Sequence, residues 1–359
     1  MNKSGMHQHQ ARNAGIDALR LFSMYMIVLV HVLGWGGVMR TASGAGRIAC
    51  GILEVFVYCS VNCFAMISGY VAYTETEKPY KYSKYVDLWI QVALYSFGIT
   101  VLFYLWDPLS VSYSMFFESL LPVSTYQYWY FAEYTAVFFL APWFCRLARA
   151  CSQAEMKRLM LTLFLLFSCF GTRTNGYASA FILGRGYSFL WLSVMYMIGA
   201  GVRKCALDER VSRKAAAMGI TVCVLCTWAV RHFLGWEGFM AYTSPTMLLT
   251  AALLLILFSR LQLGERRKKA VFRLAPASFG VYLIHVHPLV WERIMLSRFR
   301  WIGETGMAAL PLTLLCAAAV FVVCMMIELT RMTLFELLGV NRLIRRVCAW
   351  TARIGHKAV

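Results

Sequence analysis

Apolar runs of helix length recur along the whole chain and are separated by short polar segments. A run of about 20 apolar residues can span a bilayer as an α-helix. The pattern predicts ten such helices, at about 16–34, 52–73, 86–106, 126–147, 157–171, 187–203, 215–234, 243–260, 272–291 and 308–330. We therefore expect an all-α, polytopic membrane protein. In the ninth helix, Pro288 is expected to interrupt the helix just after His287.

Lysine and arginine are distributed unevenly between the predicted loops. With ten helices, the side that holds both termini has 26 of the 35 Lys and Arg residues, the opposite side has 8, and Arg20 lies within the first helix. Basic residues accumulate in the cytoplasmic loops of membrane proteins. Both termini are therefore expected in the cytoplasm. The net charge of +18 then reflects orientation in the membrane, and we expect no nucleic-acid partner.

Three segments follow from this pattern. Residues 1–15 form a cytoplasmic N-terminal segment, residues 16–330 form the transmembrane domain, and residues 331–359 form a basic amphipathic cytoplasmic tail that is expected to lie on the membrane surface. Hydrophobic residues make up 60% of the chain and charged residues 14%. This composition leaves no room for a second, soluble domain.

The first predicted helix carries three ionisable side chains, Asp17, Arg20 and His31. A charge in a membrane helix is costly, so it usually faces a partner or a water-filled cavity and marks function. Arg20 and His31 are eleven positions apart, close to three turns, so they share one face at about 16 Å along the axis. Asp17 lies one turn before Arg20 and can pair with it. One face thus presents a cation near the inner surface and an imidazole in the outer half.

The predicted orientation places further polar groups at the depth of His31. His285 lies about 20 Å along its helix from Phe272, so the two histidines can meet at one level. Glu133 and Glu54 also fall in the outer half. Histidine and carboxylate together suit general acid–base chemistry on a hydroxyl. In the alternative interpretation, the histidines only bond neighbouring helices and Glu133 is solvated in its aromatic interfacial stretch.

The inner cluster is cationic. Lys81 and Lys84 lie at the cytoplasmic mouth near Arg20, and such a cluster suits a phosphate-bearing ligand. Orientation in the membrane is the simpler explanation of these two lysines. We predict no metal site, because the side chains of His285-x-His287 would point apart on a helix.

Several segments together resemble the integral-membrane acyltransferase family 3. They are the run from Asn13 to Arg20 with His31 eleven residues after Arg20, and residues 61–64, 67–70, 128–131, 186–192 and 278–285. Members of that family O-acylate bacterial surface glycans and other exported molecules. The segments follow the family's order and cover nearly the whole chain.

The resemblance implies roles for particular residues. In that family the loss of the first-helix Arg or His abolishes transfer, which points to Arg20 and His31. Asp17, His285 and Glu133 are the further catalytic candidates.

The family also has an Arg-x-x-Arg pair at its third helix, and Lys81-x-x-Lys84 occupies that place here. Lysine keeps the charge but loses the bidentate geometry of arginine. The resemblance implies an acyl-CoA donor, usually acetyl-CoA, which we expect Arg20, Lys81 and Lys84 to bind.

We therefore expect a multi-pass enzyme of the bacterial plasma membrane that moves an acyl group from cytoplasmic acyl-CoA to a hydroxyl of an extracytoplasmic acceptor. The acceptor is expected to be a cell-surface glycan or a lipid-linked sugar, and a homodimer is an open alternative to a monomer. The alternative function is a small-molecule transporter, because the family resembles the membrane part of vancomycin-resistance serine racemases and a polar path through a helix bundle suits a permease.

Overall fold

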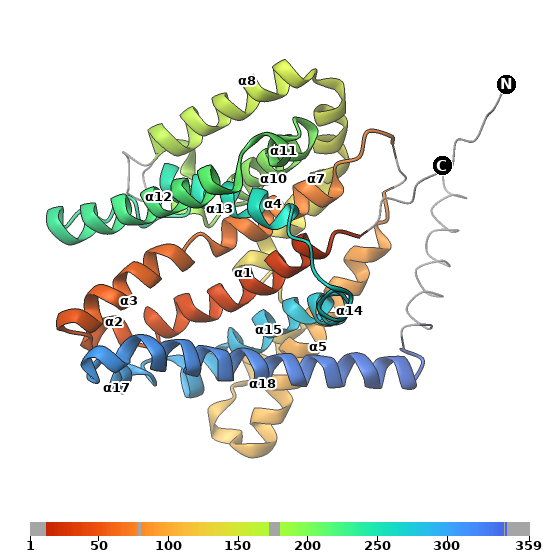
Figure 1. The fold of residues 1–359 in the computed structure, drawn as a ribbon. Helices are drawn as coiled ribbons and strands as arrows, with labels where there is room; N and C mark the ends of the chain where they lie inside the picture. The colour runs from red at the N-terminus through yellow and green to blue at the C-terminus, as the bar shows by residue number, and fades with distance from the viewer. Residues whose placement is uncertain (1–11, 78–79, 172–179, 341, 343–359) are drawn as a thin grey trace.

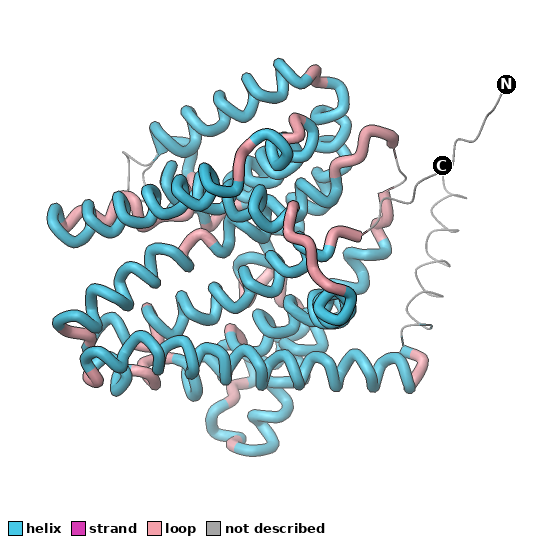
Figure 2. Tube along the Cα trace, viewed as in Figure 1, coloured by secondary structure: helices cyan, strands magenta, loops and turns pink. Residues whose placement is uncertain are grey.

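The computed structural model describes residues 12–77, 80–171, 180–340 and 342. Helices joined by short loops make up the described residues, which contain no strand (Figure 2). The all-helical prediction is confirmed. The amphipathic tail predicted for residues 331–359 lies mostly outside the described residues.

Each of the ten predicted segments contains a helix. The longer helices are α1 (Ala14–Leu33), α3 (Gly44–Val57), α4 (Ser60–Ala72), α5 (Ser83–Trp106), α7 (Trp129–Ala150), α8 (Gln153–Leu163), α10 (Phe189–Lys204), α12 (Arg213–Leu234), α13 (Pro245–Ser259), α14 (Glu265–Leu274), α15 (Ser278–His285) and α18 (Ala309–Leu337). The shorter ones are α2 (Val38–Thr41), η1 (Pro108–Ser110), α6 (Tyr113–Leu120), η2 (Phe164–Phe170), η3 (Ala180–Ile182), η4 (Gly184–Gly186), α11 (Leu207–Arg210), η5 (Ala275–Ala277), α16 (Pro288–Val290), η6 (Trp291–Met295), α17 (Arg300–Gly303) and η7 (Gly306–Ala308).

Two predicted boundaries are wrong. The second helix begins at Gly44, eight residues earlier than expected, and is interrupted between α3 and α4. The ninth helix is several pieces, α14, η5, α15 and α16, and the chain bends by 67° between His285 and Pro288. The predicted break at this proline is confirmed. Proline removes one backbone donor and cannot continue a regular helix from the preceding turn.

Five helical spans among the described residues are long and apolar enough to cross a membrane. They are α1, α3 with α4, α5, α12 and η7 with α18, and the bent pair that ends at Met295 makes a sixth if it counts as one span. α10 and α13 have 16 and 15 residues, which is short of the roughly 20 that a bilayer core requires. The chain is a multi-pass membrane protein, and the count of ten crossings stays a prediction.

α1 is the central helix of the bundle. It contacts α3, α4, α13, α14, α15 and α18 (Figure 1). By contrast, α5, α12 and α18 expose large apolar side chains such as Leu102, Val222 and Val323. In a spanning helix, an exposed apolar face is the face that meets lipid. α1 therefore lies in the interior of the bundle, where Asp17 is buried and Arg20 and His31 are partly buried.

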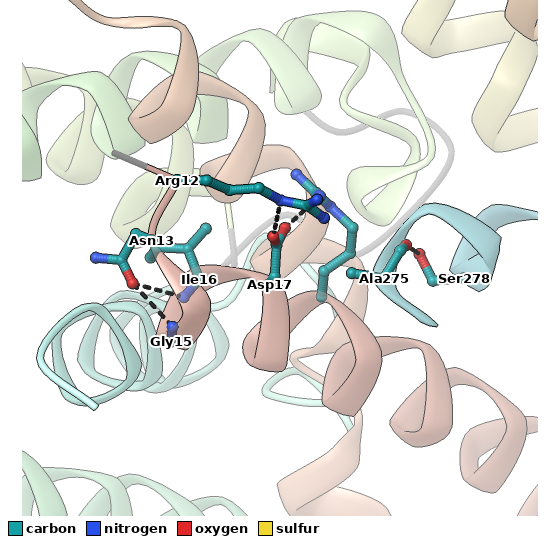
Figure 3. A network of polar contacts seen from close by, with 8 residues as sticks. Arg12, Asn13, Gly15, Ile16, Asp17, Ala275 and Ser278 are labelled. Atoms are coloured by element: carbon teal, nitrogen blue, oxygen red, sulfur yellow. Dashed lines mark hydrogen bonds and ion pairs between the residues drawn. The ribbon is translucent and has the colours of Figure 1, made fainter. Parts of the chain in front are cut away.

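The start of α1 is fixed by Asn13. Its Oδ1 accepts hydrogen bonds from the N–H groups of Gly15 (2.9 Å) and Ile16 (3.1 Å), and its Nδ2 donates to the carbonyl of Ser259 at the end of α13 (2.9 Å) (Figure 3). Gly15 lets α1 approach α13 closely, since a Cβ there would lie 1.8 Å from the carbonyl oxygen of Phe258. These contacts explain why Asn13 and Gly15 stand at this spacing.

The two ends of the bundle differ in charge. Figure 1 shows α2 and α17 at one end, and α14 with the C-terminal end of α18 at the other. α14 also contacts α1, and five of its residues are basic: Arg266, Arg267, Lys268, Lys269 and Arg273. The most basic helix therefore lies at the end of the bundle where α1 begins.

Polar contacts attach α5 to the bundle. Glu328 of α18 is fully buried and accepts hydrogen bonds from Gln91 Nε2 (3.0 Å) and from the hydroxyl of Tyr95, while Arg331 Nε donates to it from one turn away (2.8 Å). Nearer the other end of α5, His287 Nε2 donates to the Ser96 carbonyl (3.0 Å). An apolar space remains between α5 and α18 beyond these contacts.

Gly199→Ala should destabilise the protein more than Gly98→Ala. α4 and α10 cross so closely that a Cβ at Gly199 would lie 2.0 Å from the Met66 carbonyl oxygen, whereas a Cβ at Gly98 of α5 meets nothing within 4 Å. Overpacking costs about 1–3 kcal/mol, and alanine in a helix is favoured over glycine by roughly 0.5–1 kcal/mol. Thermal unfolding of both variants in detergent measures the difference; equal midpoints would contradict the close crossing.

Candidate functional site

The structure joins the two histidines that the sequence places at one depth. His31 lies in the last turn of α1 and His285 ends α15. His31 Nδ1 lies 2.9 Å from His285 Nε2, so the predicted meeting of the two rings is confirmed. Trp291, which follows the bend, packs edge-on against His31 with ring centroids 5.0 Å apart.

The partners of His285 determine which nitrogen atoms carry protons. His285 Nδ1 lies 2.6 Å from the carbonyl oxygen of Val281, and a carbonyl can only accept, so this nitrogen carries the hydrogen. In a neutral imidazole the other nitrogen is then an acceptor. His285 Nε2 therefore accepts from His31 Nδ1–H, and His31 Nε2 keeps a free lone pair. The pair is arranged so that His285 fixes the tautomer and the orientation of His31.

His31 faces a small cavity inside the bundle. The cavity has a volume of about 50 Å³ and is lined from α1 by Met24, Ile27, Val30 and His31. Its other walls come from α4, α7, α15 and the Tyr187 and Tyr242 side chains, and they are mostly aromatic. Several of the sequence segments that resemble the acyltransferase family contribute to these walls.

Asn62 holds one wall of this cavity in place. It is fully buried, donates from Nδ2 to the Tyr242 carbonyl (2.8 Å) and accepts at Oδ1 from the indole N–H of Trp191 (2.9 Å). It thus links α4 to α10 and to the loop before α13. This explains the asparagine in the segment 61–64 as a positioning residue.

His285 also lies in the wall of a second, larger space on the other side of the histidine pair. This groove has a volume of about 840 Å³ and runs between α5 and α18, with α15 and η6 at its floor. Its lining is apolar apart from His285 and Tyr95, and includes exposed residues such as Phe97, Leu102 and Val323. We call it the α5–α18 groove. The histidine pair separates the inner cavity from this lipid-facing groove.

Three arginines and one carboxylate form a pocket of about 360 Å³ at the start of α1. The carboxylate is Asp17, which is buried and pairs with Arg12 and with Arg20 Nη1 (2.8 Å) (Figure 3). The predicted Asp17–Arg20 pair is confirmed. The third arginine is Arg203. One carboxylate against three guanidinium groups leaves an excess of two positive charges in this cationic pocket.

Sequence analysis missed Arg203 and Arg12. Arg203 ends α10, its Nη1 donates to the Tyr70 carbonyl (3.0 Å), and its guanidinium lies 5.1 Å from the centre of the Tyr70 ring. Because Arg203 ends the predicted helix 187–203, the sequence could have placed it at the same membrane depth as Arg20. Helical periodicity gives depth and face, but it does not say which helices are neighbours.

The cationic pocket and the inner cavity follow one face of α1. Ile16 and Arg20 line the pocket, and Met24, Ile27 and His31 line the cavity at successive spacings of three or four residues. Such spacings keep side chains on one helix face. The stripe that the sequence predicts is therefore present, with a cation at one end and the imidazole at the other.

The structure does not bring the remaining candidates to these two spaces. Lys81 and Lys84 are exposed at the start of α5 and are not part of the lining of the cationic pocket. Glu133 accepts hydrogen bonds from the Tyr126 hydroxyl (2.9 Å) and the backbone N–H of Phe189 (2.6 Å). These contacts anchor the start of α10. The donor-binding and catalytic roles of these three residues stay predictions.

Two further polar residues are structural. Glu54 of α3 pairs with Arg231 of α12. His287 accepts at Nδ1 from the Leu289 N–H (3.3 Å) and so caps α16. Within the described part of the chain, no three His, Cys, Asp or Glu residues are grouped so that they could hold a metal ion.

Comparison with known proteins gives one match. A family model described as an acyltransferase domain matches residues 13–329. No curated protein and no solved structure matches the chain. The matched span contains Arg20, His31, Arg203 and His285, and so includes both ends of the stripe on α1.

Proposed function

The chain belongs to the acyltransferase family whose model spans residues 13–329, and from this premise we propose that it is a membrane O-acyltransferase. It transfers an acyl group from acyl-CoA to a hydroxyl of an extracytoplasmic acceptor. The main support is the histidine pair, because it leaves His31 Nε2 with a free lone pair beside a cavity that continues the face of α1 carrying Arg20.

The proposed orientation places the cationic pocket at the cytoplasmic surface. The basic helix α14 lies at the same end of the bundle as the start of α1 (Figure 1), and basic residues favour the cytoplasmic side. In this proposal the chain crosses a bacterial plasma membrane ten times, with both termini in the cytoplasm. His31 then lies in the outer half of the membrane, about 16 Å from Arg20 along the axis of α1.

The cationic pocket suits the phosphate groups of acyl-CoA. Arginine binds phosphate through a planar set of donors, and the pocket holds two positive charges in excess of its carboxylate. Asp17 pairs with Arg12 and Arg20 and so holds both guanidinium groups at the entrance. Bound here, the donor supplies an acyl group activated as a thioester, and the face of α1 directs it toward His31.

His31 acts as the general base in this proposal. Its free Nε2 takes the proton from the acceptor hydroxyl as the oxygen attacks the acyl carbon, and afterwards gives that proton to the departing sulfur. His285 accepts from Nδ1–H throughout, which stabilises the charged form of His31 as it develops. The cavity of about 50 Å³ has room for only a few water-sized groups, since one water needs about 10–15 Å³ of such volume. This size favours acetyl over a longer acyl group.

The acceptor that the structure favours is a lipid-linked sugar. The α5–α18 groove is apolar, opens on the lipid-facing side of the bundle and has His285 in its wall. Its volume lies in the range of roughly 300–1,000 Å³ that ligand sites have. A hydrocarbon chain in this groove would anchor the acceptor in the membrane next to the histidine pair, and in this proposal the sugar hydroxyl reaches past the pair into the inner cavity, where His31 Nε2 acts. A free surface glycan remains the alternative acceptor.

His31→Ala should abolish acyl transfer and leave the protein folded and inserted. Removal of a general base costs about 10²- to 10⁴-fold in rate. The assay is transfer of labelled acetyl from acetyl-CoA to the envelope lipids and glycans of cells that express the protein. His232→Ala on α12 is the matched control, because His232 stacks on Trp228 and lines neither space. Uptake of a small solute into vesicles without acetyl-CoA turnover would instead support the transporter.

Arg203→Ala and Arg20→Ala should each raise the KM for acetyl-CoA more than they lower kcat. A hydrogen bond to a charged group contributes about 1.5–3 kcal/mol, which corresponds to roughly 10- to 100-fold in affinity. Lys81→Ala and Lys84→Ala test in the same assay the pair that the sequence suggests. The control is Lys214→Ala, which removes an exposed lysine outside the pocket. An unchanged KM in both arginine variants would argue against donor binding there.

Gly98→Leu should lower transfer to lipid-linked acceptors and leave the KM for acetyl-CoA unchanged. Gly98 lines the α5–α18 groove, and a Cβ there would meet nothing within 4 Å, so a leucine side chain can extend into the groove. Displacing one or two methylenes of a bound chain costs about 0.8 kcal/mol each, or roughly tenfold. Leu105→Trp adds bulk to an exposed position of α5 outside the groove and should have no effect. Normal transfer by Gly98→Leu would exclude the groove as the acceptor site.

A further inference from the structure

Three buried hydroxyl groups donate no hydrogen bond to any of the described residues. They belong to Ser23, Ser60 and Tyr282, which are 0%, 0% and 5% exposed. A buried polar group without a partner is costly, and native proteins nearly always provide one. When such a polar group lies in a binding site, a bound ligand is the natural candidate for its missing partner.

Two of the three hydroxyl-bearing side chains line the inner cavity together with His31. Ser60 begins α4, and Tyr282 stands one turn before His285 on α15. They thus approach the cavity from two different helices. Ser23 is absent from the residues that line this cavity.

Local structure leaves these hydroxyls without an acceptor. A serine in a helix usually donates to the carbonyl four residues earlier, but for Ser60 this is the Phe56 carbonyl, which accepts from the Cys59 thiol (3.3 Å) instead. The Tyr282 ring is held by its neighbours, with the Phe279 ring centroid at 6.0 Å and the His285 centroid at 6.4 Å. The Ser60 hydroxyl therefore has no partner, and the Tyr282 oxygen lies near the backbone N–H of Tyr130, which leaves its own O–H free to donate.

We propose that the Ser60 and Tyr282 hydroxyls donate hydrogen bonds to the carbonyl oxygen of the acyl group and form the oxyanion hole of the reaction. This inference rests on the proposed acyltransferase function. Fixed donors aimed at a developing negative charge in a water-poor site stabilise a transition state strongly. Both side chains line the cavity that His31 also lines, where the general base must act.

The step balances with the groups named. The acceptor oxygen forms a bond to the acyl carbon while His31 Nε2 takes its proton, and the electron pair of the carbonyl π bond moves to the carbonyl oxygen. Ser60 and Tyr282 donate to that oxygen as its charge develops. The carbonyl then re-forms, the carbon–sulfur bond breaks, and His31 returns the proton to the sulfur. The products are the acyl ester and free CoA thiol.

The test compares Ser60→Ala and Tyr282→Phe with Ser23→Ala in the full-length protein in lipid nanodiscs. Each substitution removes one buried hydroxyl without an acceptor, and only the first two remove it from the cavity. Loss of one oxyanion donor typically lowers kcat about 10²- to 10³-fold. We expect such a fall in Ser60→Ala and Tyr282→Phe, with the KM for acetyl-CoA and the pH profile of kcat unchanged, and wild-type kinetics in Ser23→Ala.

Thermal unfolding is measured in parallel. Because none of these hydroxyls donates a hydrogen bond within the protein, none of the three variants should have a markedly lower melting temperature than the wild type. A fall in kcat that comes with an equal loss of stability would overturn the proposal in favour of a packing role. A shifted pH profile would do so in favour of proton transfer.

The assay also separates this inference from the function on which it rests. If wild-type protein releases CoA from acetyl-CoA and acetylates envelope lipids or glycans, but Ser60→Ala and Tyr282→Phe do so within threefold of its rate, the oxyanion hole is wrong and the acyltransferase remains. If the wild type itself transfers nothing, the proposed function fails first.

Discussion

A polar side chain within a bilayer must find its partner inside the protein, because the hydrocarbon core offers no water to bond it. The interior of this bundle follows that constraint closely. Asp17 pairs with two arginines, Glu54 with Arg231, and Glu328 with Arg331 and two residues of α5. The Glu54–Arg231 pair joins α3 to α12, and Glu328 joins α18 to α5, so these helices are tied together although they are distant in sequence. The Asp17 pairs instead hold the charges at the start of α1.

The histidine pair obeys the same constraint and adds direction to it. The Val281 carbonyl fixes the hydrogen on His285 Nδ1, so His285 Nε2 accepts from His31 Nδ1–H. His31 Nε2 is then left with a free lone pair. A backbone group of α15 thus sets the chemical state of a side chain on α1. One contact between α1 and α15, the one between His31 and His285, is enough for this. The bend after His285 keeps this contact at the C-terminal ends of both helices.

Much of this arrangement was predictable from spacing alone. A rise of 1.5 Å per residue places Arg20, His31 and His285 at their depths, and one turn pairs Asp17 with Arg20. Lateral neighbours were not predictable in this way. Arg203 reaches the pocket because α10 packs tightly on α4 through glycines. Glu133 lies away from the site because it accepts a hydrogen bond from the backbone at the start of α10. The positions of Arg203 and Glu133 both depend on which helices pack against each other, and a single sequence carries little information on helix neighbours.

The bend of 67° between His285 and Pro288 has a chemical consequence. It returns the chain over the end of α1, so that Trp291 covers the edge of His31 and Trp35 lies beside Trp291 at 6.4 Å between ring centroids. An activated ester next to a free base would be consumed by any water that reached it. In the proposed reaction, indole rings at this position cover one side of the base and limit its contact with water. The bend in one helix would thereby protect the activated acyl group of the donor from futile hydrolysis.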